Sequence, residues 1–186
     1  DERGALLIVD EIQSGFGRTG KMFAVQHFDV IPDLLTCAKS LAGGVPMGAL
    51  LIGHNVKNLT PGVHGSTFGG NPLVCAAALA ALSVMQDEDL PGQAAAKGAY
   101  LMDKLEQLQS PHIREVRGVG LMIGIELKQK VAPYIKALQE RGIIALNAGM
   151  TVIRLLPPLV ISYEQIDHLV EVLTEVLVTD LVSVDS

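Results

Sequence analysis

An uninterrupted apolar run, Ala5 to Val9, ends at Asp10 and limits the folds that are open to this chain. Such a run, without polar alternation, is typical of a strand buried on both faces in a parallel sheet. Ligands of open α/β sheets bind beyond the carboxyl ends of these strands. The run therefore predicts an α/β fold with Asp10 at the edge where a site would lie. A helix N-cap, or a salt bridge with Arg3 or Arg18, is the alternative role for Asp10.

Lys39 follows a second short apolar segment and precedes the glycine pair Gly43-Gly44. Its small and apolar neighbours predict a buried amine, and burial lowers a lysine pKa, so that a neutral amine can form a Schiff base with a carbonyl. A buried lysine with a structural partner is the alternative. Together, Lys39 and Asp10 suit pyridoxal phosphate, which needs a lysine for its aldehyde and an acid beside its pyridine nitrogen.

Three blocks of sequence, residues 9–20, 32–39 and 65–72, resemble the class III aminotransferases. These are pyridoxal-phosphate enzymes of fold type I, the aspartate aminotransferase-like α/β fold. The resemblance extends to about Val178 and implies the C-terminal half of such an enzyme. It implies part of the large-domain sheet in residues 1–88, a connecting helix in 89–110, and a small C-terminal α+β domain in 111–186.

The resemblance implies roles for a cofactor-binding segment and a catalytic lysine. Asp10 would pair with the pyridine nitrogen, and Glu11 belongs to the same cofactor-binding segment. Ile12 would pack on one face of the ring, and Gln13 would hydrogen-bond its phenolic oxygen. Lys39 would hold the cofactor's aldehyde and move the proton between the substrate Cα and the cofactor.

Ser66 and Thr67 are implied to act at a shared site. Thr67 would bind the phosphate of the neighbouring subunit's cofactor, which implies a homodimer, and Ser66 would lie at the substrate end of that site. The alternative is a helix cap before residues 71–85. The neighbouring Gly69-Gly70-Asn71-Pro72 block argues against that alternative.

Arg154 stands alone in the apolar segment 151–158. A guanidinium binds a carboxylate bidentately and does not lose its charge, so Arg154 needs an acidic partner. The resemblance implies that this partner is the substrate's α-carboxylate. An internal pair with an acid such as Glu126 is the structural alternative.

Residues 15–20 also fit the nucleotide-binding pattern G-x-G-x-x-G. A dinucleotide fingerprint needs a tight turn from strand to helix, whereas four residues separate the strand from Gly15 and no amphipathic helix follows Gly20. Residues 15–21 also fit the P-loop pattern G-x-x-x-x-G-K, but Met22 then occupies the position where a P-loop has the magnesium-binding Ser or Thr. We therefore do not expect a nucleotide site.

Composition restricts the partners and the compartment. The net charge is −6, without a basic stripe, which argues against nucleic acid. Apolar stretches are too short or too alanine-rich for a membrane span of about 20 residues. The two cysteines, Cys37 and Cys75, and the five histidines lack metal-ligand spacing, so we assign no metal site. Reduced thiols favour a cytoplasmic protein.

The remaining elements follow from periodicity, caps and turn residues. We predict strands at 34–37, 48–52, 143–146 and 152–155, an extended segment at 121–127, and helices at 71–86, 92–108, 131–141 and from the Ser162 cap to about 178.

Residues 63–68, 113–122 and 148–154 resemble acetylornithine and succinylornithine aminotransferases and their lysine-biosynthesis relatives, which act on carrier-protein-linked substrates. Those enzymes pass an ω-amino group to 2-oxoglutarate, giving a semialdehyde and glutamate. A 4-aminobutyrate or other ω-amino acid aminotransferase is the alternative within the class, and a non-catalytic scaffold subunit is the alternative outside it.

The family's upstream segment, which supplies a phosphate-cradling helix N-terminus and a ring-stacking aromatic residue, has no counterpart in this sequence. We therefore expect the chain alone to be inactive and to expose apolar surface.

Overall fold

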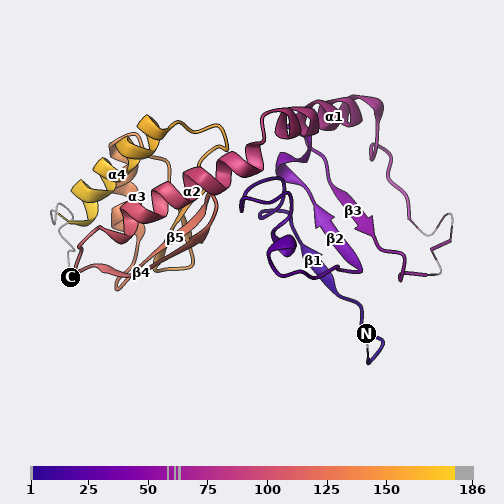
Figure 1. The fold of residues 1–186 in the computed structure, drawn as a ribbon, viewed down its shortest axis with the longest axis horizontal. Helices are drawn as coiled ribbons and strands as arrows, with labels where there is room; N and C mark the ends of the chain where they lie inside the picture. The colour runs from indigo at the N-terminus through magenta and orange to yellow at the C-terminus, as the bar shows by residue number, and fades with distance from the viewer. Residues whose placement is uncertain (1, 58, 61, 63, 179–186) are drawn as a thin grey trace. The chain divides into compact units, whose positions relative to one another are not determined.

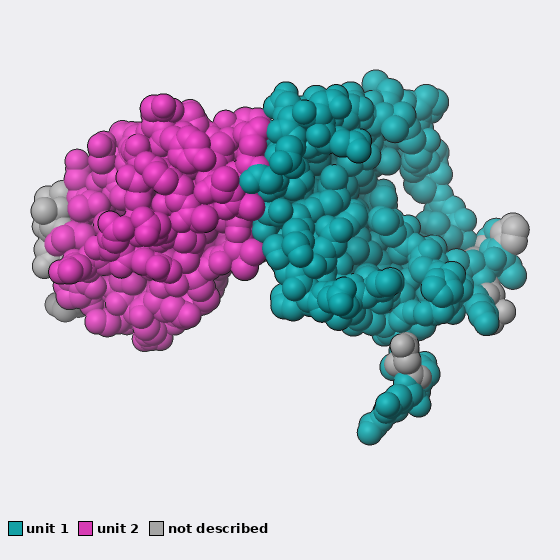
Figure 2. Space-filling model, in the orientation of Figure 1, with its two compact units in different colours: residues 1–92 teal, residues 93–186 magenta. Residues whose placement is uncertain are grey.

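The computed structural model describes residues 2–57, 59–60, 62 and 64–178. The chain forms two compact units, residues 1–92 and 93–186 (Figures 1 and 2), and each contains its own sheet. The division into three parts at residues 88 and 110 stays a prediction. No helix in the described residues is long and apolar enough to span a bilayer.

The first unit is built on a three-stranded sheet of order β1-β2-β3 (Figure 1). Its strands are β1 (Ile8–Asp10), β2 (Leu34–Cys37) and β3 (Ala49–Ile52). β1 pairs with β2 in parallel, and β2 pairs with β3 antiparallel. The parallel pair confirms the predicted α/β character, and the strands predicted at 34–37 and 48–52 are confirmed to within one residue.

The predicted burial of the first strand is wrong. Only Ile8–Asp10 forms a strand, and Ile8 is 61% exposed. On β3, the neighbouring residues Leu50 and Leu51 point to opposite faces and are both exposed. Apolar residues on both faces are typical of strands that other elements cover on both sides. The described residues leave much of this sheet uncovered, so the expected exposure of apolar surface is present.

Two short 3₁₀ helices, η1 (Ala24–His27) and η2 (Lys39–Ala42), and one long helix, α1 (Pro72–Asp87), complete the first unit. Asn71 begins α1, because its side-chain oxygen accepts a hydrogen bond from the Val74 N–H at 3.2 Å. The helix predicted at 71–86 is therefore confirmed. α1 packs on η2, and both contain buried residues; Phe16 and Leu35 of the same unit are buried as well.

The second unit has a four-stranded antiparallel sheet of order β4-β5-β7-β6 and three helices. Its core is continuous: buried residues of the sheet, such as Ile125 and Ile153, pack with buried residues of all three helices. The elements are α2 (Leu90–Glu106, beginning in the first unit), β4 (Ile113–Val119), β5 (Met122–Leu127), α3 (Ala132–Glu140), β6 (Leu146–Ala148), β7 (Val152–Leu155) and α4 (Tyr163–Leu177).

Local sequence signals account for most of these boundaries. Ser162 and Gln165 form a capping box at the start of α4, with reciprocal bonds of 3.2 and 2.9 Å, so the predicted cap is confirmed. The strand at 152–155 is confirmed as well. The helix predicted from residue 92 begins two residues earlier, at Leu90, because a proline is tolerated in the first turn.

The strand predicted near 143–146 is present but displaced toward the C-terminus, since β6 begins only at Leu146. The N–H of Ile143 donates to the Leu138 carbonyl, and that of Gly142 donates to the Gln139 carbonyl. This pair of bonds, with Gly142 at φ +79°, closes α3 as a Schellman motif. The Ile143 N–H is thereby used by the helix end and does not join the sheet.

Gly98 and Gly120 provide a stability test of the second unit. A methyl group added at Gly98 would lie 2.2 Å from the Gly120 carbonyl oxygen, which belongs to the tight turn between β4 and β5. We predict that Gly98→Ala lowers the free energy of unfolding by about 1–3 kcal/mol, measured by urea denaturation. Helix propensity alone would give the opposite sign. Ala95→Gly, at an exposed position of α2, is the matched control and should cost about 1 kcal/mol. A Gly98→Ala chain as stable as the parent would contradict the close packing.

Asp33, just before β2, connects the start of this strand to the segments that contain Leu7 and Asn55. Its carboxylate accepts hydrogen bonds from the Leu7 N–H at 2.8 Å and from the Asn55 side chain at 3.2 Å. The Leu7 bond, followed by that of Asn55, lowers the pKa of Asp33 below its ordinary value of 3.8. A carboxylate with a depressed folded-state pKa contributes stability above the unfolded pKa, and this is lost as the pH falls through the folded pKa.

We therefore predict that the stability difference between the parent and Asp33→Asn is constant above about pH 5 and narrows at lower pH. Urea unfolding at a series of pH values measures this difference. Asp87→Asn, at the exposed end of α1, controls for the loss of one negative charge. An unchanged difference down to the acid unfolding range would count against the Asp33 contacts.

Candidate active site

Asp10 and Lys39 lie at the same edge of the first sheet. Because β1 and β2 are parallel, their carboxyl ends meet at one edge, where Asp10 is paired in register with Thr36. Lys39 follows two residues after β2 ends. The pairing of two parallel strands thus brings together the carboxylate and the amine that the sequence singled out.

Two hydrogen bonds orient the Asp10 carboxylate. The Thr36 hydroxyl donates to Oδ1 at 3.2 Å, and the Ile12 N–H donates to the same atom at 2.9 Å. Both of these bonds reach Oδ1. Among the described residues, they leave Oδ2 to accept a hydrogen bond from a ligand. The N-cap alternative is wrong, because residues 12–19 form turns and no helix begins there.

The predicted burial of Lys39 is wrong, since its side chain is exposed. Lys39 begins η2 at the open edge of the sheet, and burial depends on what covers that edge rather than on the apolar residues beside it in the sequence. Its backbone φ is +49°, in the left-handed region that is unfavourable for a side chain. Such backbone strain is concentrated at functional sites. The structure therefore presents a reachable amine on a strained backbone.

Glu11 stabilises the loop that follows Asp10. It is completely buried, and its two carboxylate oxygens accept hydrogen bonds from the Val25 N–H at 2.7 Å and the Ser14 hydroxyl at 2.5 Å. These contacts hold the loop in place behind Asp10. Burial, followed by the charge of Glu11, raises the pKa of the Cys37 thiol at the end of β2. The cofactor contact implied for Glu11 stays a prediction.

Ile12 and Gln13 are half-buried in the same loop, beside Asp10. The glycines at 15–20 belong to its turns, and the next helical element is only the four-residue η1. A Cβ at Gly15 would lie 2.8 Å from the Glu11 carbonyl oxygen, so this glycine is required by loop packing. This geometry differs from the strand-to-helix turn of a dinucleotide site.

Ser66 and Thr67 are exposed in the loop that precedes α1. The Ser66 hydroxyl oxygen accepts a hydrogen bond from the Gly69 N–H at 2.9 Å, which folds this loop into a compact turn. The helix-cap alternative for these two residues is wrong, because Asn71 caps α1. Val63, the first residue of the segment 63–68, lies outside the described residues.

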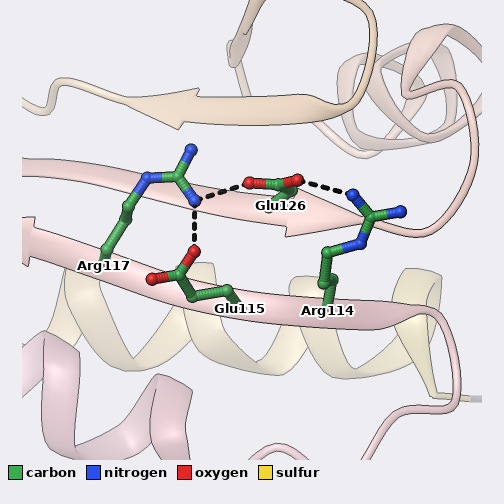
Figure 3. A network of polar contacts seen from close by, with 4 residues as sticks. All are labelled: Arg114, Glu115, Arg117 and Glu126. Atoms are coloured by element: carbon green, nitrogen blue, oxygen red, sulfur yellow. Dashed lines mark hydrogen bonds and ion pairs between the residues drawn. The ribbon is translucent and has the colours of Figure 1, made fainter.

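Arg154 belongs to the second unit, on β7, whereas the other predicted site residues belong to the first. Its side chain is half-buried and its Nε is shielded from solvent. The alternative partner, Glu126, is engaged elsewhere: it pairs with Arg114 at 2.9 Å and with Arg117 at 2.7 Å (Figure 3).

Sequence reasoning missed Thr36 as the residue that orients Asp10. The sequence does show a hydroxyl residue near the end of the second strand. Whether this hydroxyl reaches Asp10 depends on the register between β1 and β2, which the sequence does not give. Glu11 was assigned to the cofactor, although its observed contacts stabilise the loop.

The family to which the chain belongs follows from comparison with known proteins. The family model described as "Aminotransferase class-III" matches residues 1–177, so the chain belongs to the class III aminotransferases. Among similar curated proteins, a [LysW]-aminoadipate semialdehyde transaminase from Deinococcus radiodurans is 58% identical, over 95% of this chain and 42% of the relative. An ornithine aminotransferase 2 from Staphylococcus aureus is 49% identical, over 92% of this chain and 44% of the relative.

Solved structures agree with this assignment. An acetylornithine aminotransferase from Elizabethkingia anophelis is 40% identical with a TM-score of 0.87, over 95% of this chain and 46% of that one. An ornithine aminotransferase from Toxoplasma gondii, described with pyridoxal phosphate (PLP) at its active site, is 39% identical with a TM-score of 0.88, over 95% and 43%. The predicted α/β fold of the PLP-dependent transferases is thereby confirmed. The chain spans less than half the length of these relatives.

Pyridoxal 5′-phosphate is the cofactor of this family, and the exposed edge residues fit it. The Lys39 amine is accessible to an aldehyde. The Asp10 carboxylate is fixed through one oxygen, which leaves the other for a protonated ring nitrogen. The donor set at the sheet edge is therefore consistent with the cofactor.

The strained backbone at Lys39 gives a prediction about stability. Glycine tolerates φ +49° without cost, whereas alanine does not. We predict that Lys39→Gly is more stable than Lys39→Ala by about 1–2 kcal/mol in urea unfolding. Ser40, the next residue of η2, does not have a positive φ and provides the control pair. At position 40, the alanine variant should be at least as stable as the glycine variant. Equal stabilities of the two Lys39 variants would argue against the strain.

Proposed function

We propose that the protein containing this chain transfers the ω-amino group of an N-acetylornithine-like donor to 2-oxoglutarate, giving a semialdehyde and glutamate, in arginine or lysine biosynthesis. The observation that carries the proposal is the meeting of Asp10 and Lys39 at one edge of a parallel strand pair. The names of the relatives favour ω-amino donors: aminoadipate semialdehyde, ornithine and acetylornithine aminotransferases.

When bound, pyridoxal phosphate supplies a ring that accepts electrons from the substrate carbon that carries the transferred amino group. Asp10 would keep the ring nitrogen protonated, because an adjacent carboxylate favours the charged form. Lys39 would hold the cofactor by its aldehyde and, once displaced by the donor, carry the proton to and from the substrate carbon that bears the transferred amino group. Ile12 would pack on the ring, and Gln13 would hydrogen-bond the phenolic oxygen. Glu11, in the same segment, would support the loop that carries them.

Arg154 would bind the α-carboxylate of the amino-acid substrate and of 2-oxoglutarate, because a guanidinium matches a carboxylate with two parallel hydrogen bonds. Ser66 would lie near the substrate. Thr67 would donate to the cofactor phosphate of the neighbouring subunit, so that a homodimer is the active form. We further propose a cytoplasmic location, based on the cysteine usage.

Absorbance spectroscopy of the full-length protein tests this function. Addition of pyridoxal phosphate should produce the visible band of the lysine-bound cofactor, and N-acetylornithine should bleach it. Lys39→Ala should lack the band, because it has no amine to hold the aldehyde. Restoration of the band by 2-oxoglutarate would complete the reaction cycle.

Other outcomes separate the alternatives. A band that responds to 4-aminobutyrate but not to N-acetylornithine or ornithine would replace the proposed donor and keep the cofactor. A wild-type protein without a band, identical to Lys39→Ala, would refute the enzymatic function and leave the scaffold alternative.

A further inference from the structure

Thr36 contacts the end of β1 through both its side chain and its backbone. Its hydroxyl donates to Asp10 Oδ1 at 3.2 Å, and its carbonyl accepts a hydrogen bond from the Glu11 N–H at 3.0 Å. The register pairs Asp10 directly with Thr36 across the parallel strands. One residue of β2 therefore holds the Asp10 carboxylate and also the peptide group that follows it.

The Asp10 carboxylate needs more than one contact to be oriented. The last side-chain torsion of an aspartate has broad, roughly two-fold minima, so a carboxylate held by one donor can turn and exchange its two oxygens. The Ile12 N–H, which donates to Oδ1 at 2.9 Å, belongs to the loop that continues β1. The Thr36 hydroxyl reaches the same oxygen from the neighbouring strand. Two donors from different segments restrict this rotation and keep the same oxygen engaged.

The segment that contains Thr36 also leads to the candidate catalytic amine. Thr36 is the third residue of β2, and Lys39 follows two residues after the strand ends. Within the described part of the chain, both donors to the Asp10 carboxylate reach Oδ1, so Oδ2 remains for a ligand. A single short segment thus provides the amine proposed for the cofactor's aldehyde and the hydroxyl that orients the carboxylate proposed for its ring nitrogen.

We infer that the Thr36 hydroxyl is a positioning group that makes cofactor affinity depend on the ring nitrogen. By sharing Oδ1 with the Ile12 N–H, it keeps Oδ2 available to that nitrogen. This inference rests on the role proposed for Asp10. Without the hydroxyl, the carboxylate keeps one donor and turns more freely, so its contact with the nitrogen is weakened. Contacts with the aldehyde and the phosphate do not depend on Thr36 and are retained.

The test uses the full-length protein without its cofactor and compares two ligands by isothermal titration calorimetry. One is pyridoxal phosphate, and the other is its deaza analogue, in which a C–H group replaces the ring nitrogen while the aldehyde and the phosphate are kept. The parent should bind pyridoxal phosphate more tightly than the analogue. Thr36→Val, which keeps the β-branched shape but lacks the hydroxyl, should raise the Kd of pyridoxal phosphate about three- to tenfold. The Kd of the analogue should change less than about twofold.

Two further variants control for effects on the fold. Thr36→Ser keeps a hydroxyl and should restore the Kd of both ligands to within about twofold of the parent values. Thr174→Val is the matched control, because its hydroxyl also donates a hydrogen bond, to the Val170 carbonyl at 2.7 Å, but lies on α4 of the second unit. It should leave both Kd values unchanged. Thermal unfolding of every variant monitors the fold.

Asp10→Asn separates this inference from the proposed role of Asp10. An amide is neutral, so this variant should lose the preference for pyridoxal phosphate over the analogue. If the preference is unchanged, the role proposed for Asp10 fails, and the inference fails with it. If Asp10→Asn removes the preference but Thr36→Val does not, the inference alone is overturned.

The double variant of Asp10→Asn with Thr36→Val completes a double-mutant cycle. Without a carboxylate to position, loss of the hydroxyl should have little further effect on the Kd of pyridoxal phosphate. An equal loss of affinity with and without the Asp10 carboxylate would overturn the inference. So would a Thr36→Val protein in which both ligands lose affinity equally, because Thr36 would then act by supporting the pairing of β1 with β2.

Discussion

The parallel pairing of β1 with β2 is the constraint on which the candidate site depends. Parallel strands have their carboxyl ends at the same edge, so residues far apart in the sequence become neighbours without any direct bond between them. Asp10 is oriented by Thr36 only because the two residues are paired in register. Glu11, the next residue, is fixed inside the loop and anchors the chain where it leaves the strand. The geometry of the candidate site is therefore first a property of strand register.

The second unit differs from the first in how the two faces of its sheet are used. Its sheet is antiparallel and has a closed core on one face, which leaves the opposite face free for charged side chains. Ion pairs on that face, among them those of Glu126 with Arg114 and Arg117, contribute little to stability. The unit thus combines a continuous apolar core with a charged outer face.

Sequence reasoning succeeded where the determining signal is local. The Ser162 capping box, the Asn71 helix start and the strand at 152–155 depend on residues within a few positions of one another. It failed where a property depends on distant partners. The exposure of Lys39 depends on what covers the sheet edge, and the strand expected from residue 143 begins only at Leu146 because the Ile143 N–H closes α3.

The candidate site shows the same division. Asp10 and Lys39 could be identified from the sequence, because their positions after apolar strands are a local pattern. The orienting role of Thr36 could not, since it requires the register of two strands. The engagement of Glu126 by two arginines likewise requires the arrangement of β4 against β5, so the sequence left an internal pair with Arg154 open.

β3 has a consequence for the behaviour of the chain in solution. It is an edge strand of the described sheet, its residues Leu50, Leu51 and Ile52 are all exposed, and none of its four residues is charged or a proline. Edges of this kind accept additional strands from other molecules, and natural proteins usually protect them with lysine, proline or a covering element. The same apolar surface that suits a larger sheet would make the isolated 186-residue chain prone to aggregation. The solubility of the chain thus depends on whether the sheet that contains the candidate site is covered.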